Sequence, residues 1–152
     1  MIGLETRVKN VPNNYLYQIF SGIDLTKYIW EINEDYIMCC DGDVHRETLF
    51  DKDGIDGEEF LKCISRDGYY MLFADIKAFL MDGTRMAIKT YEDFLESDCQ
   101  MIILCTDVTF IDFYCKDAAI LEKVYKNCID NNFEEVKIVT PENNFRTRMS
   151  VW

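Results

Sequence analysis

The sequence contains a single histidine among its 152 residues, and this scarcity limits the catalytic sites that it can build. A closed zinc site needs several His or Cys ligands at short spacing, and the chain has no His-x-x-x-His or Cys-x-x-Cys pair. A Cys-His or Ser-His-Asp mechanism would have to use His45. The chain also lacks a Gly-x-x-x-x-Gly-Lys loop, a dinucleotide fingerprint and a Gly-x-Ser-x-Gly elbow. We therefore expect no cofactor and favour a protein that is not an enzyme.

The sequence also lacks any apolar run of the roughly 20 residues that a membrane span requires. Its N-terminus has no basic segment followed by a long apolar run, so no export signal is expected. The cysteines are odd in number, show no paired spacing and lie mostly inside apolar runs, which is typical of reduced core residues in the cytoplasm. They are Cys39, Cys40, Cys63, Cys99, Cys105, Cys115 and Cys128.

Hydrophobic residues make up 49% of the chain and charged residues 29%, which predicts a packed core with a charged surface. The length fits one ordinary domain, which we place at residues 1–152. The formal net charge is −12, so the field of the protein repels phosphate backbones and anionic lipids. We therefore expect no binding to nucleic acid or membranes, and we expect a protein partner with a basic surface. The alternative is that the acidity only keeps the protein soluble.

Residue periodicity predicts the main secondary structure. Strands are indicated where apolar residues alternate or dominate, at residues 2–9, 69–76, 101–105, 108–115 and 136–140. Helices are indicated where apolar residues recur at intervals of three and four, at residues 12–22, 56–64, 90–97 and 117–132.

Several shorter elements complete the expected fold. Residues 27–32 and 36–40 predict a hairpin with its turn at Glu34 and Asp35. Short strands are expected at residues 48–50 and 149–152, and the pair 101–105 and 108–115 is expected at the centre of the sheet. Two hairpins and about four helices of uneven length predict an α+β fold with a mixed or mainly antiparallel sheet.

A long loop rich in Asp and Gly, residues 41–57, is a candidate site. Asp41, Asp43 and His45 occupy alternate positions, so an extended backbone would place their side chains on one side. Two carboxylates and an imidazole could then bind a metal. The alternative is an ordinary surface loop without a ligand.

A carboxylate inside an apolar strand is the second candidate feature. Asp112 lies in the run 108–115, where burying an unpaired charge would be costly. Arg146 and Arg148 are the expected ion-pair partners. Alternatively, these two arginines and the asparagines before them form a small anion-binding patch.

Exposed aromatic residues are the third candidate feature, because aromatics are enriched in protein interfaces. Trp30 and Trp152 are the interaction candidates of this kind. The alternative is that the aromatic residues mostly fill the core.

Two segments carry a family resemblance. They are Phe110–Asp117, with the sequence FIDFYCKD, and Phe145–Trp152, with the sequence FRTRMSVW. Together with Ile23-Asp24 and Tyr28-Ile29-Trp30 they resemble a family of small uncharacterised proteins from spore-forming Gram-positive bacteria. The resemblance implies a bacterial protein and a free-standing domain of unknown function, and it carries no activity.

Two hypotheses about function follow. The first is an intracellular interaction or regulatory domain that binds another protein through an acidic and aromatic surface. The second is a small-ligand or metal-binding protein, or an enzyme, whose site uses the loop from Asp41 to His45. A narrower third hypothesis is an acidic mimic of nucleic acid.

Overall fold

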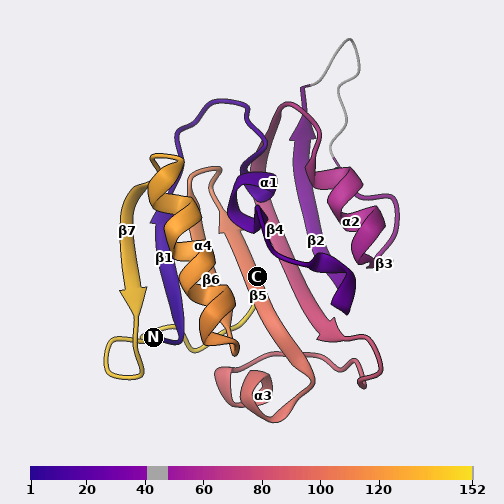
Figure 1. The fold of residues 1–152 in the computed structure, drawn as a ribbon, viewed down its shortest axis with the longest axis vertical. Helices are drawn as coiled ribbons and strands as arrows, with labels where there is room; N and C mark the ends of the chain where they lie inside the picture. The colour runs from indigo at the N-terminus through magenta and orange to yellow at the C-terminus, as the bar shows by residue number, and fades with distance from the viewer. Residues whose placement is uncertain (41–47, 152) are drawn as a thin grey trace.

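In the computed structural model, which describes residues 1–40 and 48–151, the chain forms one seven-stranded sheet and four α-helices (Figure 1). The strand order is β3-β2-β4-β5-β6-β1-β7, and every pair is antiparallel. The expected α+β class with a mainly antiparallel sheet is therefore confirmed. The strands are β1 (Gly3–Arg7), β2 (Tyr28–Cys39), β3 (Gly54–Asp56), β4 (Tyr69–Leu80), β5 (Cys99–Thr106), β6 (Phe110–Cys115) and β7 (Glu134–Val139).

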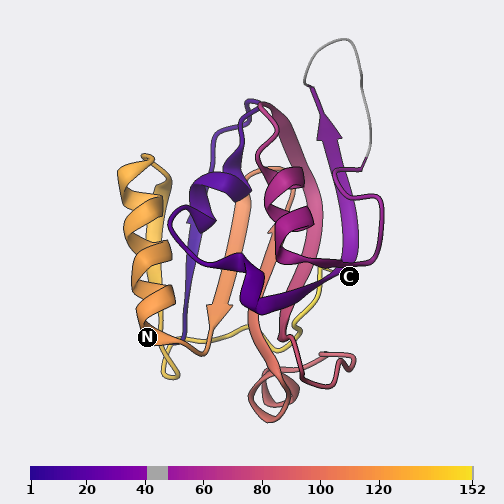
Figure 2. The same cartoon turned by 45° about the vertical axis from the view of Figure 1, so that its right-hand side comes forward.

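The helices are unevenly shared between the two faces of the sheet (Figures 1 and 2). α1 (Tyr15–Phe20), α2 (Gly57–Ile64) and α4 (Ala118–Asp130) cover one face, which we call the helix face. A 3-10 turn, Leu25–Lys27, precedes β2. α3 (Tyr91–Glu96) packs at one end of the opposite face, which residues 140–151 also cross. We call this opposite face the tail face.

The middle strand, β5, is apolar on both sides, as a covered central strand requires. Met101 and Ile103 pack toward the helix face, whereas Ile102 and Leu104 pack toward the tail face. A tight turn joins β5 to β6, and within it Asp107 and Val108 have positive φ values of 50° and 71°. The expected central hairpin is therefore present.

Local capping fixes the ends of the helices. Thr90 and Asp93 form a capping box at the start of α3. The Asp117 carboxylate accepts hydrogen bonds from the first backbone N–H groups of α4. At the other end of α4, Asn132 adopts a left-handed conformation with φ 59°. These helix boundaries follow from residues that are visible in the sequence.

Trp30 anchors the core of the helix face. It is 1% exposed, and its ring stacks on that of Phe60 from α2, with centroids 3.9 Å apart. Its indole N–H donates to the carbonyl of Leu25 at 3.1 Å. Trp30 therefore fixes α2 against β2 and presents no surface to a partner, which corrects its expected place in an interface.

None of the seven cysteines, all of which the structure describes, forms a disulfide, and all but Cys40 are buried. Burial raises the pKa of Cys63 and Cys115 to about 11 and that of Cys128 to about 12. These thiols stay protonated near neutral pH, so they are poor nucleophiles and serve as packing groups.

The helices in the described part of the chain are too short or too polar to cross a bilayer.

The hairpin predicted at residues 27–40 is wrong, because β2 is one strand that pairs with β4 along its whole length. Two irregularities in register, after Ile32 and after Tyr36, accommodate the polar residues at which a turn was expected. The Asp35 carboxylate accepts backbone hydrogen bonds from Leu49 and Phe50 at 2.8–3.1 Å. An acidic residue within a strand here holds the following segment in place.

Neither of the two short predicted strands forms in the described residues. At residues 48–50, the backbone N–H groups of Leu49 and Phe50 donate to the Asp35 carboxylate and not to a neighbouring strand. At residues 149–151, the carbonyls of Arg148 and Ser150 on either side of Met149 accept from the Arg146 guanidinium at 3.0 and 3.2 Å. Side chains bind the backbone at both places, and a single main-chain bond, from Met149 N–H to the Lys89 carbonyl at 3.0 Å, does not extend into a strand ladder.

Gly57→Ala should destabilise the protein, because a Cβ at this position would lie 2.0 Å from the carbonyl oxygen of Leu25. Both groups belong to the main chain, and overpacking of this kind costs about 1–3 kcal/mol. Gly68→Ala is the matched control, because its Cβ would meet Pro12 at an ordinary 3.4 Å. Urea unfolding measures both variants, and equal stability would contradict the close approach of α2 to the turn before β2.

Candidate functional site

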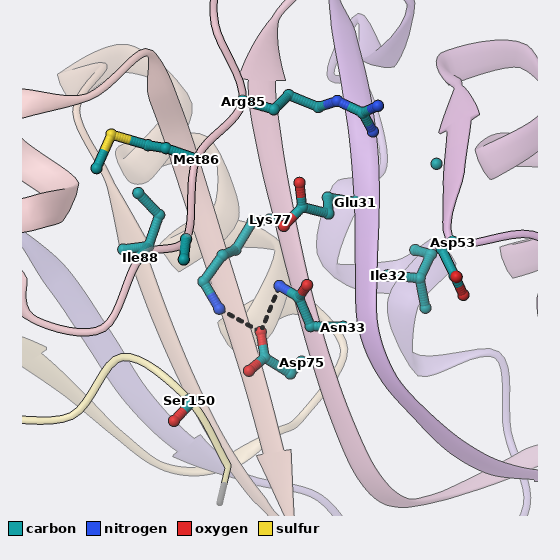
Figure 3. A pocket seen from close by; sticks show the side chains of 12 residues that line it. Glu31, Ile32, Asn33, Asp53, Asp75, Lys77, Arg85, Met86, Ile88 and Ser150 are labelled. Atoms are coloured by element: carbon teal, nitrogen blue, oxygen red, sulfur yellow. Dashed lines mark hydrogen bonds and ion pairs between the residues drawn. The ribbon is translucent and has the colours of Figure 1, made fainter.

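A cavity of about 820 Å³ lies on the tail face between β2, β4 and residues 85–88 (Figure 3). We call it the tail-face cavity. Ser150, from the C-terminal segment, adds a further wall. Strand alternation explains its polar lining, because the neighbours of each lining residue on β4 point into the core of the helix face. Its lining residues are Glu31, Ile32, Asn33, Asp53, Gly54, Asp75, Lys77, Arg85, Met86, Ala87, Ile88 and Ser150.

A buried ion pair forms the floor of the tail-face cavity. Lys77 is 2% exposed and Asp75 is 3% exposed, and Lys77 Nζ donates to Asp75 Oδ1. The Asn33 amide reaches the same oxygen at 3.5 Å (Figure 3). Removing two such charges from water costs several kcal/mol per ion, and their attraction often does no more than offset this cost. A gain in stability alone is therefore a weak explanation for this pair.

Glu31 and Arg85 bring two further charges to the same cavity. Within the described residues, neither side chain forms a hydrogen bond or an ion pair. The Arg85 guanidinium rests on the backbone of Gly54, where a Cβ would lie 2.6 Å from Nη1. Gly54 is the register partner of Glu31 across β2 and β3, so both charges belong to the same part of the cavity wall.

The apolar part of the wall comes mainly from Ile32, Met86 and Ile88. Behind the ion pair lies Cys99, whose pKa is raised to about 12 by burial, while the positive charge of Lys77 acts in the opposite direction. The thiol therefore stays neutral and supplies no nucleophile. The cavity combines fixed charges with apolar side chains, an arrangement that suits the binding of a polar ligand.

A second cavity, of about 460 Å³, lies over β1, β6 and β7 on the tail face. Arg7 Nη1 lies 3.1 Å from Glu135 Oε2, and Arg146 Nη2 lies 2.7 Å from Asp112 Oδ2. These charges neutralise one another. The tail-face cavity is larger and holds a buried ion pair in its lining, so it is the better candidate for a ligand site.

The family described as "Protein of unknown function (DUF2691)" matches residues 1–150. The chain belongs to this family. This DUF2691 chain is 31% identical over 150 residues to the uncharacterized protein YncE of Bacillus subtilis (strain 168), and the match covers 98% of each chain. The expected resemblance to uncharacterised proteins of spore-forming bacteria is confirmed. No solved structure matches the chain.

The predicted site residues of the DUF2691 chain have different outcomes. Asp41, Asp43, His45 and Trp152 lie outside the described residues. Among the residues that are described, no three His, Cys, Asp or Glu side chains gather where they could hold a metal ion.

Of the two arginines expected beside Asp112, the structure has Arg146 in contact, whereas Arg148 is exposed. Arg146 also binds two carbonyls of its own segment, so one guanidinium ties the C-terminal segment both to itself and to β6.

The lining of the tail-face cavity was missed by sequence analysis, although three of its charged residues had a signal in the sequence. Asp75 and Lys77 lie inside an apolar strand, as Asp112 does, and the cost of burying a charge marks them equally. Glu31 also alternates with buried residues on β2. Arg85 follows no pattern, because only the fold brings its loop against Gly54.

Arg146→Ala should lower the free energy of unfolding by about 1.5–3 kcal/mol, the usual contribution of hydrogen bonds to charged groups. It would leave Asp112, whose side chain is 18% exposed, without its cation and would release the C-terminal segment. Arg148→Ala is the matched control, because its exposed side chain makes no hydrogen bond or ion pair with the described residues and should change stability by less than about 0.5 kcal/mol. Urea unfolding measures both, and a larger loss for Arg148→Ala would refute this role of Arg146.

Proposed function

We propose that the protein binds a small polar ligand in the tail-face cavity. The observation that carries the proposal is the Lys77–Asp75 ion pair, almost fully buried in the floor of a cavity that opens to solvent. Two charges held in a fixed position by a strand are suited to orient a polar molecule. Because the two charges neutralise each other in a partly desolvated site, the pair acts on an incoming ligand as a fixed dipole.

The size and lining of the cavity support this proposal. Its volume of about 820 Å³ falls within the usual range of small-molecule sites, roughly 300–1,000 Å³. Strands of the central sheet supply Glu31, Asn33, Asp75 and Lys77, so these side chains stand on rigid backbone. The charged side chains would bind the polar groups of such a molecule, and Ile88 would contact its apolar part.

Binding to a basic protein stays a prediction. The net charge of −12 supports it, as does the exposure of scattered apolar side chains such as Phe145, which is 88% exposed. A small ligand is favoured because a cavity with unpaired charges is a more specific feature than overall acidity.

Filling the cavity tests the proposal. Ala87 is exposed and lines the cavity, so Ala87→Trp should block it without disturbing the core. Ala119→Trp, on an exposed site of α4 at the helix face, is the matched control. A thermal-shift panel of amino acids, short peptides, amines, organic acids, sugars and nucleosides is run on all three proteins.

We expect at least one class to raise the melting temperature of the wild type and the control. A ligand at 100 times its Kd adds about 2.7 kcal/mol of stability, which corresponds to several degrees. The rise should vanish in Ala87→Trp. A panel without any rise, or a rise that Ala87→Trp retains in full, would count against the proposal.

A further inference from the structure

Glu31 and Arg85, two opposite charges without an ion-pair partner among the described residues, both line the tail-face cavity. Gly54 lies opposite Glu31 in the sheet, and the Arg85 guanidinium rests on the same glycine. Both side chains line the cavity, and Figure 3 shows them on the same side of it. No ion pair joins them in the described part of the chain. Considering residues 1–40 and 48–151 alone, the cavity therefore offers one carboxylate and one guanidinium that are not ion-paired.

Among the charged residues of the cavity, Glu31 and Arg85 are the ones best placed to bind a ligand. Asp75 and Lys77 neutralise each other, and Asp53 is an exposed acid at the rim. The lining then holds three acidic and two basic residues. A ligand that complements it needs groups of both signs.

We infer that the cavity binds a zwitterion, either a free amino acid or a short peptide, with Glu31 accepting from its ammonium group and Arg85 donating to its carboxylate. The inference rests on the proposed function and names its ligand class. A guanidinium presents its N–H groups in a fork that matches a carboxylate. An ammonium group has three N–H donors, and the Glu31 carboxylate and the side-chain oxygen of Asn33 can accept hydrogen bonds from them.

Ligands with only one charge fit less well. An anion would be bound by Arg85 but repelled by Glu31 and by the overall charge of −12. A simple amine would be bound by Glu31 and repelled by Arg85. A molecule with both groups satisfies both side chains at once.

The missing side chain of Gly54 leaves room for the Arg85 guanidinium, so Gly54 positions this group. A Cβ at this site would collide with the guanidinium at 2.6 Å, and the next contacts are also with Arg85. The clash involves only the end of a flexible side chain, so Gly54→Ala should move the guanidinium and leave the fold intact. This separates the role of Arg85 in binding from any role in stability.

Isothermal titration calorimetry tests the ligand class. Each standard amino acid, triglycine and trialanine are titrated into the wild type, which distinguishes free amino acids from peptides. For the tightest ligand, the amine that lacks its carboxylate and the acid that lacks its ammonium are titrated as matched probes. The zwitterion should bind at least about tenfold more tightly than either, because each probe loses one charged contact.

Variants assign the two contacts. Arg85→Gln and Gly54→Ala should each weaken the zwitterion by about tenfold or more and leave the affinity for the matched amine unchanged or higher. Glu31→Gln should weaken the zwitterion and the amine together. Lys126→Gln and Glu122→Gln, exposed charges on α4 at the other face, should change nothing.

The outcomes separate this inference from the proposed function. If none of these zwitterions binds, or if the single-charge probes bind as tightly, the ligand class is wrong. The proposed function then still stands when another class raises the melting temperature in a manner that Ala87→Trp abolishes. If nothing that binds responds to Ala87→Trp, both fail.

Discussion

The tail face depends on one electrostatic constraint, which is that Lys77 and Asp75 must neutralise each other out of water. They lie two residues apart on β4, so both point to the same face, while Ile76 between them points into the core of the helix face. A strand near the centre of a sheet is an unusual place for two charges. A buried ion pair is costly without polar neighbours. Polar side chains and open space lie above this pair.

The uneven cover of the sheet provides that space. Three helices close the helix face, and the tail face is left to α3, the segment 81–90 and the C-terminal segment (Figures 1 and 2). Arg146 holds the C-terminal segment by binding Asp112 and two carbonyls at once. Its position lets Ser150 form one wall of the cavity. Charge pairing at β6 thus shapes a site that lies over β4.

Most of the fold could be predicted from the sequence because its signals are local. Alternation marked β1, a continuous apolar run marked β5, and capping residues such as Asp117 marked the helices. The hairpin expected around Asp35 failed, because that carboxylate binds the backbone of Leu49 and Phe50, a contact between distant residues. The site was harder to predict, because it too depends on contacts between residues that are distant in the sequence. The cost of burying a charge could have flagged Lys77, whereas only the fold brings Arg85 against Gly54, the register partner of Glu31.

The central claim is that the Lys77–Asp75 pair is kept for binding and not for stability. The double variant Asp75→Leu with Lys77→Met, measured by urea unfolding and by ligand-induced thermal shift, tests it most directly. Replacing a buried ion pair with apolar residues is often neutral or stabilising by about 1–4 kcal/mol. The account predicts a variant at least as stable as the wild type that no longer responds to the ligands of the tail-face cavity. A variant that is strongly destabilised but still responds to those ligands would contradict it.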